Sequence, residues 1–349
     1  MHILMVFINN SNAINNKYNY DIRYKVFYDM SLLLKERGHT IYVSPCDDGT
    51  KLTKDLYDKF IIFSEKKHKH LIQLYIGWSP AMIKNNIKSK YSNIPTIFYE
   101  NGHMKDSVII DPNGLFEKSK YINTLNKLCE INYDENKCNN FIENYLNSNS
   151  SKRPQSSVID IPQNINKKYI FIPTQKINDI SLKNSKVSMF KCITETCYFC
   201  KSKQIPLVIK IHPHLKGIAK QNQIDYINKL IKDLEYTNIY LSSTSINYLM
   251  KNSRFTVSLN GGSIMDNFIN NTPILVLIHS MYSKTDAVVF SDNIQDGLNK
   301  MFNSDYNITK MLKKQKQIVW WYITHNLFAY NIPEDNINIL QKHITNIIL

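Results

Sequence analysis

The chain alternates short apolar runs with longer amphipathic stretches, a pattern that is typical of alternating strands and helices. In the first third, the predicted strands are the short apolar runs at residues 3–8, 40–44, 60–63, 71–76 and 96–99. We expect one helix between them at residues 22–37, ended by Gly38, and another at residues 79–90, with Pro80 in its first turn. Strands and helices in this order predict a mainly parallel sheet.

The same rhythm restarts after a helical region at residues 115–146 and a polar, linker-like segment at residues 147–157. The second set of predicted strands lies at residues 169–173, 207–211, 239–241, 255–259 and 274–278. The predicted helices between them lie at residues 185–202, 223–234 and 246–251, and another opens near residue 264. From residue 296 the tail is helical in pattern, and Trp320, Trp321 and Tyr322 are expected to pack it across a domain junction.

The length fits two domains. The chain has 349 residues, too many for one ordinary core and enough for two domains of about 150 residues each. We predict an N-terminal domain at residues 1–158, a second domain at residues 159–315, and a C-terminal helical segment at residues 316–349 that crosses the junction.

Composition narrows the class of protein. No apolar run approaches the roughly 20 residues that span a bilayer. The first residues lack a basic segment and a small-residue cleavage site, so they are interpreted as a strand and not as a signal peptide. We therefore expect a cytoplasmic protein, or one associated peripherally with the inner face of a membrane.

The charge is strongly basic. A net charge of +14, from 43 basic and 29 acidic residues, favours phosphorylated substrates, polyanions or anionic membrane surfaces as partners. Clusters of basic residues occur only at residues 66–70 and 313–316, and most lysines are interpreted as solvated faces. No nucleic-acid-binding module is recognisable, so no specific nucleic-acid partner is expected.

Three of the six cysteines, Cys192, Cys197 and Cys200, fall in one helix-like stretch. They could form half of a zinc site, but the sequence has no second ligand pair at a suitable spacing. We interpret them as reduced cysteines on a packed helix. No Asp-x-Asp motif follows a predicted strand, and we expect chemistry that needs no metal.

Polar turns follow two predicted strands of the second half. His212-Pro213-His214 follows the run 207–211, and Asn260-Gly261-Gly262-Ser263 follows the run 255–259. In open α/β sheets, ligands bind at the carboxyl ends of the strands. Free backbone N–H groups at a helix start suit a phosphate. The two turns together predict a nucleotide site.

Six short motifs occur in order between residues 75 and 280. They are Gly77-Trp78, Glu100-Asn101-Gly102-His103-Met104-Lys105-Asp106-Ser107, Asp111-Pro112-Asn113-Gly114, Gln175-x-x-x-Asp179, Lys210-Ile211-His212-Pro213 and the segment from Asn260 to Val276. In their order and spacing they resemble the motifs of the bacterial capsule polysaccharide biosynthesis family, which contains the retaining β-Kdo glycosyltransferases.

The resemblance implies a GT-B fold, in which two Rossmann-like α/β domains face each other across a cleft. The first domain would supply the acceptor and catalytic groups, and the second would bind the nucleotide. The implied donor is CMP-Kdo, the implied acceptor is a polysaccharide or glycolipid, and no further cofactor is implied. Asp111 is the candidate nucleophile of a retaining reaction, and Glu100 is the candidate acid/base or acceptor-activating group. His103 and Lys105 are expected to contact the acceptor or the carboxylate of the sugar.

The donor-binding candidates come from the second half of the chain, and they are Gln175, Asp179, Lys210, His212, Asn260, Gly261, Gly262, Ser263 and Asp266. His212 is expected to contact the donor phosphate, and Asp266 a ribose or base group. Lys210 adds charge, although strand alternation could direct it elsewhere.

Each role has a purely structural alternative. His212 could cap the sheet edge, and Asp266 could offset a helix dipole. Asp111 could form the turn in Asp-Pro-Asn-Gly, and Glu100 could be an exposed acid at a strand end.

The motifs also depart from the family pattern, at Asn101, Lys105, Gly261, Ile264, Asp266 and Asn271. Two alternatives to CMP-Kdo transfer therefore stay open. The first is a GT-B transferase that uses CMP-sialic acid or a UDP-sugar, and the second is a catalytically silent protein that binds a glycan or a nucleotide.

Overall fold

The computed structural model describes residues 1–7, 22–45, 54–78, 93–105, 107–114, 119–148, 155–176, 179, 182, 185–213, 215–303, 306–325, 327, 328 and 344. The predicted helix at residues 79–90, residues 149–154 of the linker-like segment, and His214 lie outside them. By its contacts the chain divides into two compact units, and each is described by itself. Unit 1 contains Met1–Lys120 and Tyr322–Leu349, and unit 2 contains Tyr121–Trp321.

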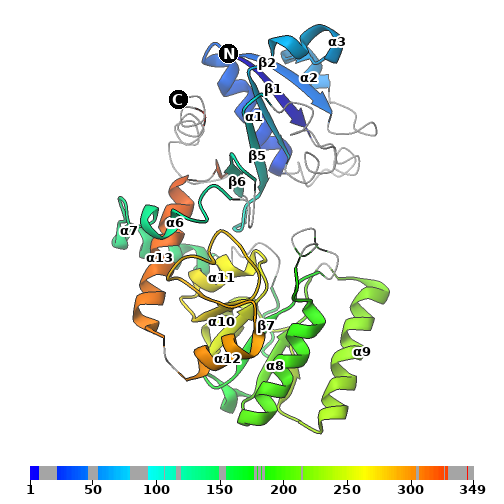
Figure 1. The fold of residues 1–349 in the computed structure, drawn as a ribbon, viewed down its shortest axis with the longest axis vertical. Coiled ribbons are helices and arrows are strands. Elements are labelled where there is room, and N and C mark those ends of the chain that lie inside the picture. Colours follow the sequence, from blue (N-terminus) through cyan, green and yellow to red (C-terminus); the bar gives the residue numbers. More distant parts are fainter. Residues whose placement is uncertain are drawn as a thin grey trace. The chain divides into compact units, whose positions relative to one another are not determined.

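Unit 1 is built on a seven-stranded sheet in the order β13-β6-β5-β4-β1-β2-β3 (Figure 1). Its strands are β1 (His2–Phe7), β2 (Thr40–Pro45), β3 (Ile61–Ile62), β4 (Leu74–Trp78), β5 (Thr96–Asn101), β6 (Ser107–Asp111) and β13 (Leu327–Phe328). Strands β1 to β5 pair in parallel, which confirms the predicted mainly parallel sheet. The sequence did not predict β6 and β13, which pair antiparallel at one edge.

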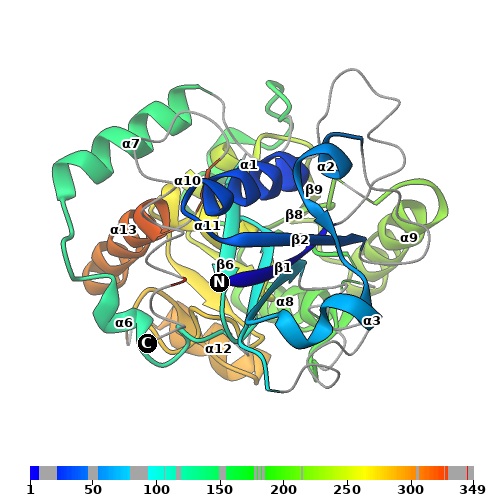
Figure 2. The same cartoon turned by 90° about the horizontal axis from the view of Figure 1, so that it is seen from above.

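Alternating residues of the unit 1 strands face two hydrophobic clusters. Ile3 and Met5 of β1 pack with helix α1 (Ile22–Glu36), whereas Leu4 and Val6 pack on the other face. This division follows from the period of two along a strand. Figure 2 shows α1 beside β2, which it contacts. The short helices of this unit are α2 (Lys54–Lys59), α3 (Glu65–His68) and the 3-10 turn η1 (Lys69–Leu71).

The end of the chain packs into unit 1. Leu327 and Phe328 of β13 pair with Val108 and Ser107 of β6, and Ile344 is buried in the cluster with α1. Tyr322–Leu349 of the predicted C-terminal segment thus belong to unit 1, and the predicted crossing of a domain junction stays a prediction. The predicted tail was wholly helical, but its described part also contains the strand β13.

Unit 2 contains a second, fully parallel sheet in the order β12-β11-β10-β7-β8-β9. Its strands are β7 (Ile170–Pro173), β8 (Leu207–Lys210), β9 (Ile239–Leu241), β10 (Phe255–Ser258), β11 (Ile274–Val276) and β12 (Val289–Phe290). The chain runs outward from β7 in one direction, and then restarts at β10 on the other side of β7. This reversal is the topological switch point of a doubly wound sheet.

The helices of unit 2 either precede β7 or follow it and the later strands. They are α6 (Leu125–Leu128), α7 (Glu135–Asn147), the 3-10 turn η3 (Gln163–Ile165), α8 (Met189–Lys203), α9 (Gly217–Leu234), α10 (Ile246–Lys251), α11 (Ser263–Ile269), α12 (Ile294–Phe302) and α13 (Ile308–His325). Helices α8, α9 and α12 share one core cluster with Ile170 and Ile172 of β7, while α10 packs with Phe171 on the other face.

The three cysteines of the CxxC region lie on α8 and are fully buried as free thiols. Burial raises the pKa of Cys192 and Cys197 to about 12, which keeps both thiols protonated at neutral pH. The interpretation of these residues as cysteines on a packed helix is confirmed by their burial on α8.

Residues 121–148 belong to unit 2 because α6 and α7 pack against α13. Trp320 Nε1 donates to the carbonyl of Asn132 at 2.8 Å, and Cys138 Sγ lies 3.3 Å from the carbonyl of Lys316. The division by contacts therefore falls after Lys120, whereas the sequence placed a boundary at residue 158 from its polar linker.

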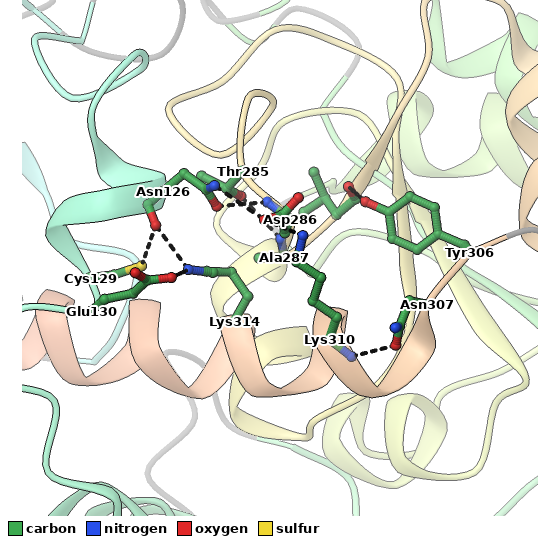
Figure 3. Close-up of polar contacts among 11 residues, drawn as sticks. Asn126, Cys129, Glu130, Thr285, Asp286, Ala287, Tyr306, Asn307, Lys310 and Lys314 are labelled. Atoms are coloured by element: carbon green, nitrogen blue, oxygen red, sulfur yellow. Dashed lines mark hydrogen bonds and ion pairs between the residues drawn. The ribbon is translucent and has the colours of Figure 1, made fainter.

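A polar network joins α6, α13 and the loop before β12 (Figure 3). The Asn126 side chain accepts from the N–H of Asp286 at 2.9 Å and donates to its carboxylate at 3.2 Å. Lys310 Nζ lies 3.1 Å from the same carboxylate. Burial alone would raise the pKa of Asp286, but the hydrogen bonds from Asn126 and Lys310 hold it below its ordinary value.

Lys314 lies at the centre of this network and is only 4% exposed. Its ammonium donates to the carbonyl of Asn126 at 2.9 Å and pairs with the carboxylate of Glu130 (Figure 3). Most lysines were interpreted as solvated, and Lys314 is an exception, because α6 covers that part of α13. Within the described residues, no helix combines the length and apolarity that crossing a membrane requires.

We predict that Lys314→Met lowers the free energy of unfolding of unit 2 by about 1–3 kcal/mol, because a buried carbonyl loses its charged donor. The matched variant Glu130→Gln is expected to cost less than about 1 kcal/mol, because the Glu130 side chain is 57% exposed. Urea unfolding followed by tryptophan fluorescence measures both, since Trp320 and Trp321 lie in this unit. Equal effects of the two variants would contradict the assignment.

Candidate functional site

Two consecutive residues after β7 connect the turns that follow its two neighbours in the sheet. Gln175 Nε2 donates to Asn260 Oδ1, after β10, at 3.2 Å. Thr174 Oγ1 accepts from the backbone N–H of His212, after β8, at 2.8 Å. Thr174, Gln175 and Asn260 are all buried. The structure therefore brings three of the predicted motifs together at the switch point of the unit 2 sheet, the place where doubly wound sheets bind ligands.

The turn after β10 is shaped around Gln175. A Cβ atom on Gly261 would lie 3.3 Å from Gln175 Oε1, so glycine here leaves room for that side chain. Gly262 precedes α11, which begins at Ser263, and Ser263 Oγ lies 3.4 Å from Ser258 Oγ. These polar groups all belong to one turn at the sheet edge.

Asn271 lies within the same motif and is one of its departures from the resembled pattern. Its φ is +49°, in the left-handed region, and its N–H donates to the carbonyl of Phe268 at 3.0 Å. Asparagine tolerates this conformation better than most other residues with a side chain. Asparagine is therefore compatible with the left-handed backbone at this position.

Lys210 is directed toward a different loop. Its ammonium donates to the carbonyls of Ser243 and Thr244, at 2.8 and 2.7 Å, in the loop between β9 and α10. Burial lowers the pKa of Lys210, and the nearby Asp160 partly offsets this effect. The structure thus gives Lys210 a role in holding this loop, while its predicted contact with the donor stays a prediction.

Asp160 organises the loop that Lys210 contacts. Its carboxylate accepts from the hydroxyls of Ser242, Ser243 and Thr244, at 2.5, 2.6 and 2.6 Å. Burial by itself would raise the pKa of Asp160, but these hydrogen bonds hold it far below its ordinary value. Asp160 holds the loop after β9, and the sequence did not single it out, because no motif contains it.

The remaining donor-binding candidates are partly exposed. Asp179 lies in a turn in which its N–H donates to the carbonyl of Lys176 at 3.1 Å. Asp266 is the fourth residue of α11, one turn from the start of that helix, as predicted. The His212 carbonyl accepts from the N–H of Leu215 at 2.9 Å, which closes the turn after β8.

In unit 1, the two candidate catalytic carboxylates lie on the antiparallel pair β5–β6. Phe98 pairs with Asp111, and Glu100 pairs with Ile109. Because paired residues share a face and residues two apart on a strand share a face, Glu100 and Asp111 lie on the same side of the sheet. Glu100 is half-buried, and its Oε1 accepts from the N–H of Asn101 at 2.9 Å.

Asp111 is fully buried and holds the chain that follows it. Its carboxylate accepts from Ser119 Oγ at 2.6 Å, from the N–H of Asn113 at 2.8 Å and from the N–H of Lys120 at 3.1 Å. Burial raises the pKa of Asp111, and these hydrogen bonds offset only part of that shift. A carboxylate in this arrangement reaches a substrate only when it leaves these donors.

Tyr322 fixes the turn between the two carboxylates. Its hydroxyl accepts from the N–H of His103 at 2.5 Å and lies 3.4 Å from Ser107 Oγ. Its ring stacks on His103 with centroids 5.8 Å apart, while Lys105 in the same turn is exposed. The sequence treated Tyr322 only as a packing residue, because its partners are more than 200 positions away along the chain.

No group of three or more His, Cys, Asp or Glu side chains in the described part of the chain is placed to hold a metal ion.

Comparisons with known proteins place these motifs in one family. The sequence model of a family described as "Capsule polysaccharide biosynthesis protein" matches residues 98–287, more than half of the chain. No individually curated protein matches.

Among solved structures, the beta Kdo 2,7 transferase of Thermosulfurimonas dismutans KpsC is similar over 100% of this chain and 99% of its own, with 14% identity and a TM-score of 0.51. The beta Kdo 2,4 transferase of the same KpsC gives 10% identity, a TM-score of 0.48, and coverage of 75% and 84%. At 14% identity, the similarity to the 2,7 transferase shows the fold alone. It confirms, with the two sheets, the predicted α/β fold of the GT-B type.

We predict that Gly102→Ala destabilises unit 1 by about 1–3 kcal/mol, as overpacking does in a closed turn. A Cβ at this position would lie 1.8 Å from Ser107 Oγ and 2.7 Å from the Ser107 carbonyl carbon. The control Gly261→Ala meets only the end of the Gln175 side chain at 3.3 Å and is expected to cost less. Thermal unfolding of both variants tests this order, and the reverse order would refute it.

We predict that Asp111 makes stability fall as pH rises. Because its pKa is raised by folding, its contribution is fully present below its ordinary pKa and is lost as pH rises through the folded value. The free energy of unfolding of the wild type, minus that of Asp111→Asn, should therefore decrease between about pH 4 and pH 7. Urea unfolding across this range measures it.

Asp134 provides a control of opposite sign. A hydrogen bond from the N–H of Lys137 lowers the pKa of this exposed residue, which caps α7. The contribution of Asp134 to stability is present above its ordinary pKa and is lost as pH falls. The free energy of unfolding of the wild type, minus that of Asp134→Asn, should therefore not decrease with rising pH. If this difference decreased with rising pH for both variants, the Asp111 carboxyl would not be the cause of the decrease.

Proposed function

Because the chain belongs to the capsule polysaccharide biosynthesis protein family, we propose that it is a glycosyltransferase. In this proposal it moves a Kdo-like sugar from a CMP-activated donor onto a surface polysaccharide or glycolipid, with retention of configuration. The observation that carries the proposal is the convergence of Gln175, Asn260 and the His212 turn at the switch point of the unit 2 sheet.

Unit 2 would bind the donor. His212 follows β8 and Asn260 follows β10, so both lie at the edge of the sheet where the nucleotide of a doubly wound protein binds. His212 would contact the phosphate, and the turn of Asn260, Gly261, Gly262 and Ser263 would supply further polar groups. Asp266 and Asp179 are partly exposed and would bind the ribose, the base or the sugar.

Unit 1 would supply the chemistry. Glu100 and Asp111 share one face of the sheet, and His103 and Lys105 lie in the turn between their strands. Asp111 would be the nucleophile, once its carboxylate leaves Ser119, and Glu100 would activate the acceptor. The side chains of His103 and Lys105 would contact the sugar carboxylate. A net charge of +14 supports an acidic acceptor or an acceptor at an anionic membrane surface.

A second candidate function is the binding of a glycan or a nucleotide without turnover. The hydrogen bonds that hold both oxygens of Asp111 favour this candidate, because they oppose attack by that carboxylate. A transferase that uses another nucleotide sugar, such as CMP-sialic acid or a UDP-sugar, is a variant of the first proposal, since the polar turns suit any nucleotide phosphate.

We predict that the protein releases CMP from CMP-Kdo in the presence of a capsule-type acceptor. With CMP-sialic acid, UDP-sugars or GDP-sugars as donors, it should release no nucleotide. Asp111→Asn should lower turnover about a thousandfold or more, as the loss of a nucleophile does. Nucleotide release and product formation are measured together.

Ser119→Ala is the matched control, because it removes a donor to Asp111 and leaves the carboxylate in place. It should keep turnover within about tenfold of the wild type. Turnover by Asp111→Asn at the wild-type rate would exclude Asp111 as the nucleophile. Binding of CMP without any donor turnover would favour the second candidate function.

A further inference from the structure

A buried glutamine on α9 lies behind the His212 turn. Thr174 Oγ1 accepts from the backbone N–H of His212 at 2.8 Å and donates to Gln223 Oε1 at 3.2 Å. A hydroxyl has one proton and two acceptor sites. By accepting that proton, Gln223 fixes the direction of the Thr174 hydroxyl and leaves a lone pair facing the N–H of His212.

Packing alone gives no reason for an amide at this position. The buried residues of α9 are Gln223, Ile227 and Leu234, so Gln223 lies on the apolar face of the helix. It is 0% exposed, and its Nε2 has no hydrogen-bond partner among the residues that the structure describes. A buried donor without a partner costs free energy, and an apolar side chain of similar size would avoid that cost. Gln223 therefore does something that the stability of the fold does not require.

We propose that Thr174 and Gln223 are positioning residues that set the His212 turn for the donor phosphate. The relay runs from the Gln223 amide oxygen, through the Thr174 hydroxyl, to the backbone of His212, and its middle member, Thr174, precedes Gln175 in the chain. This inference rests on the proposed function, because it takes His212 as the contact to the phosphate. Neither Thr174 nor Gln223 touches the nucleotide in it.

The test uses the full-length protein and CMP, with affinity measured by isothermal titration calorimetry and stability by thermal unfolding. Thr174→Val removes the hydroxyl but keeps the β-branched shape, and Thr174→Ser is its control. Gln223→Met removes the amide at similar volume. Thr174→Val and Gln223→Met should each weaken CMP binding about 3- to 10-fold, the effect of one neutral hydrogen bond, and Thr174→Ser should stay within about twofold.

Two readouts separate positioning from simple structural support. Gln223→Met should unfold at a temperature equal to or above that of the wild type, because it removes a buried donor without a partner. In a His212→Ala background, Thr174→Val should weaken CMP binding no further, since its effect passes through His212.

The outcomes that overturn the inference are distinct from those that overturn the proposed function. Wild-type CMP affinity in Thr174→Val and Gln223→Met, together with weakened affinity in His212→Ala, would remove the relay and leave the phosphate contact intact. An equal loss of CMP affinity from Thr174→Val in the wild-type and the His212→Ala backgrounds would also contradict the relay. Wild-type affinity in His212→Ala would instead remove the phosphate contact itself, and the relay with it.

Discussion

The polar edge of unit 2 depends on the position of β7 within its sheet. This strand has neighbours on both sides, β8 and β10, and the chain order reverses between β7 and β10. Side chains that follow β7 can therefore contact the turns after both neighbours, which Thr174 and Gln175 do. Ile170, Phe171 and Ile172 are fully buried, so the two polar residues extend from a strand that the hydrophobic cores on both faces hold in place. Packing of the core thus sets the geometry of the polar edge.

The first half depends on the antiparallel pair β5–β6. Its register places Glu100 and Asp111 on one face, and the buried hydroxyl of Tyr322 holds the turn between their strands. The two carboxylates have different surroundings. Glu100 is half-buried near the turn, whereas Asp111 is closed within hydrogen bonds from the chain that follows it. In the proposed reaction, Asp111 would have to exchange those donors for a substrate, so its hydrogen bond from Ser119 would have to break.

The sequence predicted the parts of the fold that local pattern controls. The strands β7, β8 and β10 are apolar runs ended by polar turns, and all three were located within one or two residues. Strand β6 was not predicted, because Val108-Ile109-Ile110 is short and lies between turn signals. Strand β13 has only two residues, and its conformation comes from pairing with β6 and not from its own propensity.

The site was predictable where motifs are contiguous, and it was not where partners are distant in sequence. Gln175 and Asn260 were named from their motifs, but their contact depends on the strand order. Thr174, Gln223, Asp160 and Tyr322 act through partners 30 or more positions away, and no local pattern marks them. Lys314 belongs to a basic cluster, yet α6 buries it, because a run of lysines does not show which of them another helix will cover.

The division of the chain into Met1–Lys120 with Tyr322–Leu349, and Tyr121–Trp321, has a consequence for biogenesis. Synthesis makes the first part of unit 1, then the whole of unit 2, and only then the segment that pairs with β6 and contributes Ile344 to the core. Domains generally fold as units during translation. Unit 2 is continuous and can thus fold during translation. Unit 1 is discontinuous, and the edge of its sheet at β6 stays unpaired until residues some two hundred codons later have been translated. Unit 1 therefore begins to emerge from the ribosome first but completes its fold last.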